Sequence, residues 1–151
     1  MHLVPQIYPG GLEVERNGAN KKVVCYLDIK VMITEKGIQT KVYNKVDDFD
    51  FPVVTFTFAS GNMPLPIGYN IFFGQILRYS RICSHKEEFM NKTASLYNTL
   101  VNHGYDERKL VGFFRKIFNK DQFILFKYGY NNNAEALLDF QTICTNHGEN
   151  Q

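Results

Sequence analysis

The spacing of apolar residues changes near residue 65, and this change constrains the fold more than any other feature of the sequence. Before that point apolar and polar residues alternate, which is typical of half-buried β-strands. After it, apolar residues recur every three to four positions, which is typical of amphipathic helices. Strands followed by helices indicate an α+β protein. We therefore predict an N-terminal antiparallel β-hairpin followed by a compact three-helix bundle with a helix-turn-helix-like outline.

The hairpin is predicted from two alternating segments. The odd positions of residues 23–33 are apolar and predict one strand, and residues 38–44 alternate in the same way. Residues 34–37 form the expected turn between them, because Gly37 adopts a positive φ without steric cost. Residues 52–58 are rich in Val, Thr and Phe but lead into glycine and proline, so we expect an irregular arm or an edge strand.

Three helices are predicted after Pro66. The second is expected to begin at Ser84 as N-cap, with Glu87 completing a capping box, and to end at Gly104. Asp106 is expected to cap the third. The predicted core faces are Tyr69, Phe72, Phe73, Ile76, Ser80 and Cys83; then Phe89, Thr93, Leu96, Tyr97 and Leu100; then Leu110, Val111, Phe114, Ile117 and Phe118.

Three regions follow from this pattern. Residues 1–66 hold the hairpin and the extended arm, residues 67–120 the helices, and residues 121–151 a short helical or disordered tail, with a helix most strongly indicated over 134–144. A chain of 151 residues with 44% apolar residues, 13 Phe and 9 Tyr has enough apolar surface for one packed core.

Several function classes lack support in the sequence. Three widely spaced cysteines suggest neither a disulfide framework nor a metal site, and we expect no cofactor. The absence of a signal-like start or a long apolar run predicts an intracellular location, cytoplasmic or nuclear. Asp47, Asp48 and Asp50 could hold Mg²⁺ in a small nuclease, or could belong to a polar turn that satisfies local backbone N–H groups.

The basic residues suggest a different activity. The net charge is only +2, but residues 105–130 contain six basic and three acidic side chains. On two helices, basic side chains could neutralise phosphates while neighbouring aromatic rings stack on unpaired bases. The alternative is an ordinary solvated basic face. The candidate nucleic-acid-binding residues are Arg78, Arg81, Arg108, Lys109, Arg115 and Lys116.

A family resemblance supports the nucleic-acid interpretation. It is carried by the order and spacing of Ile7-Tyr8-Pro9, Leu12-Glu13-Val14, Tyr26-Leu27-Asp28-Ile29, Val42-Tyr43-Asn44-Lys45 with Asp47-Asp48-Phe49, the segment from Gly74 to Cys83, and Gly104-Tyr105. Over roughly residues 7–119 the chain resembles the C-terminal part of reverse transcriptases of Penelope-like and related animal retroelements.

The resemblance implies that the hairpin is the end of a polymerase palm and that the helices form a thumb, which grips template–primer duplex. The Tyr-x-Asp-Asp motif of the family is absent and Val46 replaces a basic residue, so catalytic activity does not transfer. A thumb packs on a palm, so the chain could instead be a protein-interaction module that docks on a missing palm domain or self-associates. The candidates for the exposed apolar patch are Phe51, Phe56, Phe58, Phe72 and Phe73.

Overall fold

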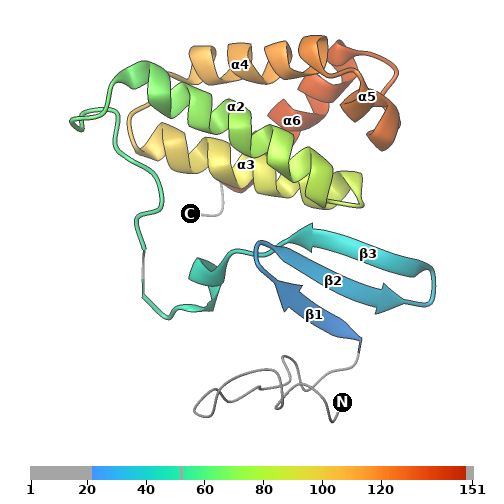
Figure 1. The fold of residues 1–151 in the computed structure, drawn as a ribbon. Helices are drawn as coiled ribbons and strands as arrows, with labels where there is room; N and C mark the ends of the chain where they lie inside the picture. The colour runs from blue at the N-terminus through green and yellow to red at the C-terminus, as the bar shows by residue number, and fades with distance from the viewer. Residues whose placement is uncertain (1–21, 52, 149–151) are drawn as a thin grey trace, which may run out of the picture.

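A computed structural model describes residues 22–51 and 53–148, with only the backbone for residues 146–148. The strings at residues 7–9 and 12–14 lie outside these ranges. The predicted α+β class is confirmed: a three-stranded antiparallel sheet precedes a group of helices and lies on one side of it (Figure 1).

The sheet consists of β1 (Val23–Tyr26), β2 (Ile29–Thr34) and β3 (Gly37–Val42), in that order. The prediction of one strand over residues 23–33 is wrong, because the chain turns back at Leu27-Asp28 and pairs Tyr26 with Ile29. Leu27 has a φ of 52°, a value uncommon for residues other than glycine. Alternation continues on both sides of this turn, so the apolar pattern does not mark it.

The second turn forms as predicted. Thr34 pairs with Gly37, whose φ is 115°. β3 then continues to Val42, which is only 3% exposed and forms the part of the sheet that reaches the helical core. The predicted second strand of the hairpin is thus confirmed, with bounds of Gly37–Val42 in place of 38–44.

Within the described ranges, five α-helices and one short 3-10 helix follow the sheet. The elements are η1 (Lys45–Asp48), α2 (Leu65–Ile82), α3 (Lys86–Asn102), α4 (Glu107–Lys120), α5 (Phe123–Tyr128) and α6 (Asn133–Gly148). In this part of the chain, no helix has both the length and the apolar character needed to cross a membrane.

Ser84 joins the sheet to the helices and does not cap α3. Its Oγ accepts a hydrogen bond of 2.7 Å from the backbone N–H of Thr40, and its own N–H donates to the Thr40 carbonyl at 2.9 Å. The predicted capping box is therefore wrong: His85 occupies the N-cap position without a side-chain hydrogen bond. A hydroxyl that binds the edge of β3 is not available to the first turn of α3.

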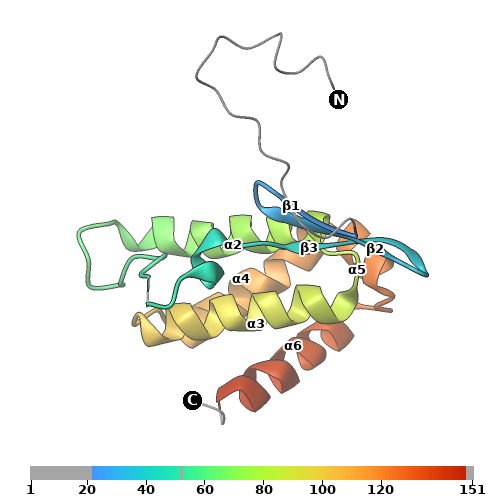
Figure 2. The same ribbon diagram turned by 90° about the horizontal axis from the view of Figure 1, so that it is seen from below.

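The core is built largely from aromatic rings, and α6 contributes to it. Phe140 of α6 stacks on Phe114 of α4 with 4.0 Å between ring centroids and meets Tyr97 of α3 edge-on at 5.3 Å. α6 lies along α3 (Figure 2). Residues 123–128 and 133–148 of the expected short helix or disordered tail thus form two helices that complete the bundle.

The arm before α2 forms no strand over residues 53–58, so of the two predicted alternatives the irregular arm is confirmed and the edge strand is not. Ala59 donates its N–H to the His103 carbonyl at 2.9 Å, and the Phe58 ring lies 4.2 Å from the His103 ring. These contacts attach the arm to the α3–α4 turn, where Gly104 has a φ of 87° and ends α3 as predicted. Phe72, predicted as a candidate for an exposed patch, is instead fully buried because it lies on the core side of α2.

Candidate nucleic-acid interface

Helix α4 carries the largest group of unpaired basic side chains in the described part of the chain. Asp106 precedes the first residue of the helix, and its Oδ1 accepts from the Lys109 N–H at 3.1 Å, so the predicted N-cap is confirmed. The Asp106 N–H donates to the Tyr69 hydroxyl at 3.1 Å. The cap therefore also fixes the start of α4 against α2.

The burial pattern of α4 orients its charges outward. Leu110, Phe114, Ile117 and Phe118 are at most 1% exposed, so one side of the helix faces the core. The opposite side carries five exposed cations, here called the basic α4 face: Arg108, Lys109, Arg115, Lys116 and Lys120.

Three carboxylates, Asp106, Glu107 and Asp121, lie at the two ends of α4, and Glu107 lines the same cavity between α4 and α6 as Arg108. Among the described residues, the ion pairs are Lys41–Glu88, Arg78–Asp28, Lys86–Asp139 and Lys92–Asp47. None of them involves a cation of the basic α4 face, so these five charges remain available to an external anion.

Aromatic rings support the lysines of this face. The Nζ of Lys109 lies 5.8 Å from the Tyr69 ring centroid, that of Lys116 lies 5.1 Å from Phe113, and that of Lys120 lies 5.5 Å from Phe73. A cation within about 6 Å of a ring centroid is weakly attracted to the ring. These contacts leave the ammonium groups exposed while the rings hold the stems along the α2–α4 boundary.

The two predicted arginines of α2 have different surroundings. Arg81 is exposed in the last turn of α2 and forms no ion pair among the described residues. Arg78 donates to Asp28 of the β1–β2 turn at 2.9 Å and to Gln75 at 3.1 Å. Because the sheet and α4 lie on different sides of α2 (Figure 1), Arg78 is directed away from the basic α4 face.

Four of the six predicted residues therefore belong to the basic α4 face. The other two lie on the neighbouring helix α2, where Arg81 is exposed and Arg78 pairs with Asp28 of the sheet. Sequence reasoning left Lys120 out of the site, although it follows Lys116 by four residues and so falls on the same helix face. Lys127, another member of the basic segment, has a structural role: its Nζ donates to the Ser80 carbonyl at 2.6 Å, and burial lowers the pKa of its ammonium group.

Two of the three carboxylates after the hairpin, those of Asp47 and Asp48, have side-chain partners. Asp47 pairs with Lys92 at 3.1 Å, and Asp48 accepts a hydrogen bond from the Tyr43 hydroxyl, which is the main cause that raises the pKa of Tyr43 to about 12. Within the described ranges, no group of three or more His, Cys, Asp or Glu side chains is placed to hold a metal ion. Asp47 and Asp48 lie in the short η1 helix, and their carboxylates bind side chains, not the local backbone N–H groups that the turn interpretation had predicted.

The fold and this surface define a small α+β protein with a helical bundle that presents one basic helix to solvent. Comparisons of the chain with protein-family models, with curated proteins and with solved structures found no match.

Proposed function

We propose that this chain binds nucleic acid through phosphate contacts of the basic α4 face, without reading bases. The observation that carries the proposal is that five cations share one helix face and have no carboxylate partner among the described residues, while aromatic rings support three of them. A 14-residue helix is about 21 Å long, which is enough to follow several phosphates of one strand.

The proposed target is template–primer duplex, and the proposed origin is the C-terminal part of a reverse transcriptase that lacks its catalytic motif. Support for this origin is the sequence resemblance described above together with a bundle that follows a small sheet. An intracellular location, in the cytoplasm or nucleus, belongs to the same proposal. The chain itself is proposed to be non-catalytic.

Salt dependence tests the proposal. If all five cations of the basic α4 face contact phosphates, the log–log slope of affinity against salt is expected to approach about −4.5, since each neutralised phosphate contributes about 0.9. The assay is fluorescence anisotropy with a labelled RNA–DNA duplex at several salt concentrations. No binding at low salt would refute the proposal for this chain.

A matched pair of double variants locates the contact. Arg115→Gln with Lys116→Gln should reduce the magnitude of the slope by about 1.8 and weaken binding to all sequences equally. Lys36→Gln with Lys45→Gln removes the same charge from exposed positions in the β2–β3 turn and in η1. Equal effects of the two pairs would show that net charge, and not the basic α4 face, governs binding.

A second candidate function is supported by exposed apolar side chains on the sheet and arm. Tyr26, Leu27, Ile38 and Val54 are 69%, 76%, 71% and 68% exposed, and Phe51 is 62% exposed. Exposed apolar surface of this extent is typical of docking sites. We propose an interaction module that docks on a palm-like domain or on a second copy; a monodisperse monomer in sedimentation velocity would exclude self-association.

A further inference from the structure

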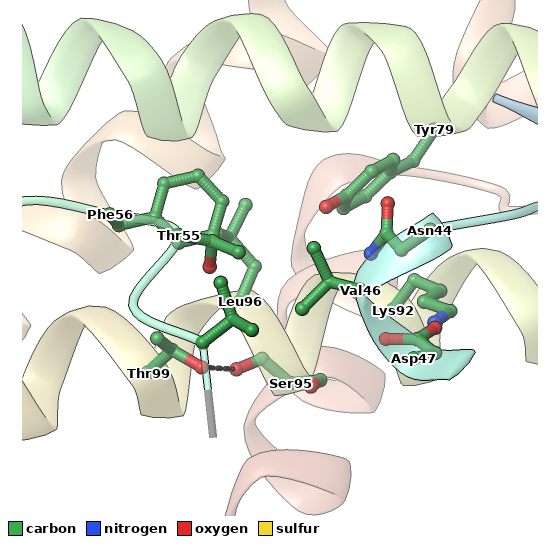
Figure 3. A pocket seen from close by; sticks show the side chains of 11 residues that line it. Asn44, Val46, Asp47, Thr55, Phe56, Tyr79, Lys92, Ser95, Leu96 and Thr99 are labelled. Atoms are coloured by element: carbon green, nitrogen blue, oxygen red, sulfur yellow. Dashed lines mark hydrogen bonds and ion pairs between the residues drawn. The ribbon is translucent and has the colours of Figure 1, made fainter. Parts of the chain in front are cut away.

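A cavity of about 240 Å³ lies between η1, the arm and helices α2 and α3. Apolar and polar side chains both line it (Figure 3). The apolar lining residues are Val46, Val53, Phe56 and Leu96, and the polar ones are Asn44, Asp47, Thr55, Tyr79, Lys92, Ser95 and Thr99. These residues come from four separate segments, so the cavity exists only in the folded chain.

The Tyr79 side chain reaches this cavity from α2. The residue is only 4% exposed, and its hydroxyl points into the space between Val46 and Phe56 (Figure 3). Among the described residues, none forms a hydrogen bond with this hydroxyl. Burial raises the pKa of Tyr79, so the hydroxyl stays protonated at neutral pH and can donate a hydrogen bond. The hydroxyl oxygen keeps some solvent-accessible surface at the cavity, where it can bond to water, and a ligand with an acceptor would replace that water.

The charges of the lining cancel. Lys92 and Asp47 are the two charged lining residues, and they pair with each other at 3.1 Å. For an anionic ligand, the cation of the lining, Lys92, is already neutralised by Asp47. For a cationic ligand, Asp47 is already neutralised by Lys92. The cavity therefore favours a neutral ligand.

The remaining polar groups offer both donors and acceptors. The Asn44 amide provides one of each, and the Ser95 and Tyr79 hydroxyls can do either. An asparagine amide matches the adjacent donor and acceptor on the edge of a nucleobase, and an aromatic ring such as that of Phe56 can support a heterocycle. The volume of about 240 Å³ exceeds that of a single ring system but is below that of most drug-sized ligand sites.

From these contacts we infer that the cavity binds a small neutral molecule with an apolar ring and both hydrogen-bond donors and acceptors, the chemistry of a nucleobase. The basic α4 face lies on the other side of α2 and α3 from η1 (Figure 1). Binding in the cavity is therefore separate from phosphate binding on α4, and either can fail without the other.

The test is an NMR titration of the full chain with uracil and adenine as probes. Saturable shifts are expected at the backbone amides of Asn44, Val46, Phe56 and Leu96, with a dissociation constant on the order of 1 mM for ligands of this size. Benzene and inorganic phosphate are the comparison probes. Equal binding of benzene, binding of phosphate in the cavity, or no saturable shift with either base would overturn the inference.

Three variants assign the contacts. Tyr79→Phe removes the hydroxyl and should weaken binding by about 3- to 10-fold, whereas Ser95→Leu adds volume at the wall and should abolish it. Tyr97→Phe is the matched control, because Tyr97 lines a different cavity against α4 and α6. A Tyr79→Phe variant with unchanged affinity, or a Ser95→Leu variant that retains native chemical shifts and still binds, would contradict the proposed site.

Discussion

Replacing Phe140 by alanine should test whether α6 is part of the core. The side chain is 1% exposed, stacks on Phe114 at 4.0 Å with an interplanar angle of 13°, and meets Tyr97 edge-on at 5.3 Å. Phenylalanine-to-alanine changes in cores cost about 3–5 kcal/mol, and each aromatic pair adds about 0.5–1.5 kcal/mol beyond area burial. Because the substitution removes the Phe140 ring from both aromatic pairs, we expect the free energy of unfolding to fall by about 4 kcal/mol.

The assay is urea unfolding followed by circular dichroism. With a slope of about 2 kcal/mol per molar, the midpoint should fall by about 2 M, and Tm should fall by roughly 8–16 °C. Leu138→Ala is the control: Leu138 is also on α6 but is 66% exposed, so its replacement should cost less than about 0.5 kcal/mol. A cost below about 1 kcal/mol for Phe140→Ala would mean that α6 does not dock on the bundle.

Three further predictions concern caps, the sheet and pH. Asp106→Ala removes the N-cap acceptor of α4 and should lower the free energy of unfolding by about 1 kcal/mol in thermal denaturation, whereas an unchanged Tm would contradict the cap. Ser84→Ala should speed hydrogen exchange of the Thr40 amide without shortening α3, because its hydroxyl binds β3; loss of helix signal instead would favour the capping box. Burial raises the pKa of Tyr97 from 10.0 to about 12 and also raises that of Tyr128. Between pH 10 and pH 12 the tyrosines of the unfolded chain lose their protons while Tyr97 of the folded chain keeps its proton, so the free energy of unfolding should fall as pH rises. Urea midpoints that stay constant over this range would contradict the prediction.

Local patterns in the sequence predicted much of the helical part. Phe72, Phe89 and Phe114 each belong to the predicted apolar face of a different helix, and all three are fully buried. The stop at Gly104 and the cap at Asp106 depend on backbone conformation and on one neighbouring N–H, so they could be predicted from a few adjacent residues. The basic α4 face was predictable for the same reason, since helical geometry alone places its members on one side.

Contacts between distant segments could not be predicted in this way. Arg78 and Arg81 are three residues apart on α2, but only Arg78 meets a carboxylate among the described residues, because the β1–β2 turn brings Asp28 to it. Ser84 has the residue type and spacing of a helix cap, but its hydroxyl accepts a hydrogen bond from the backbone N–H of Thr40 in β3, 44 residues away. The turn at Leu27 was missed since neither glycine nor proline marks it.

The sequence by itself determined the α+β class, the amphipathic helices and the positive face of α4, because each depends on the period of apolar and charged residues along a short segment. Only the tertiary structure decided which of the described cations stay unpaired, that α6 completes the core, and that four segments line a cavity at Tyr79. Gly68 shows the physical reason: a Cβ there would come within 2.1 Å of the Tyr105 hydroxyl oxygen. Such a requirement arises from packing between segments and leaves no periodic signal in the chain.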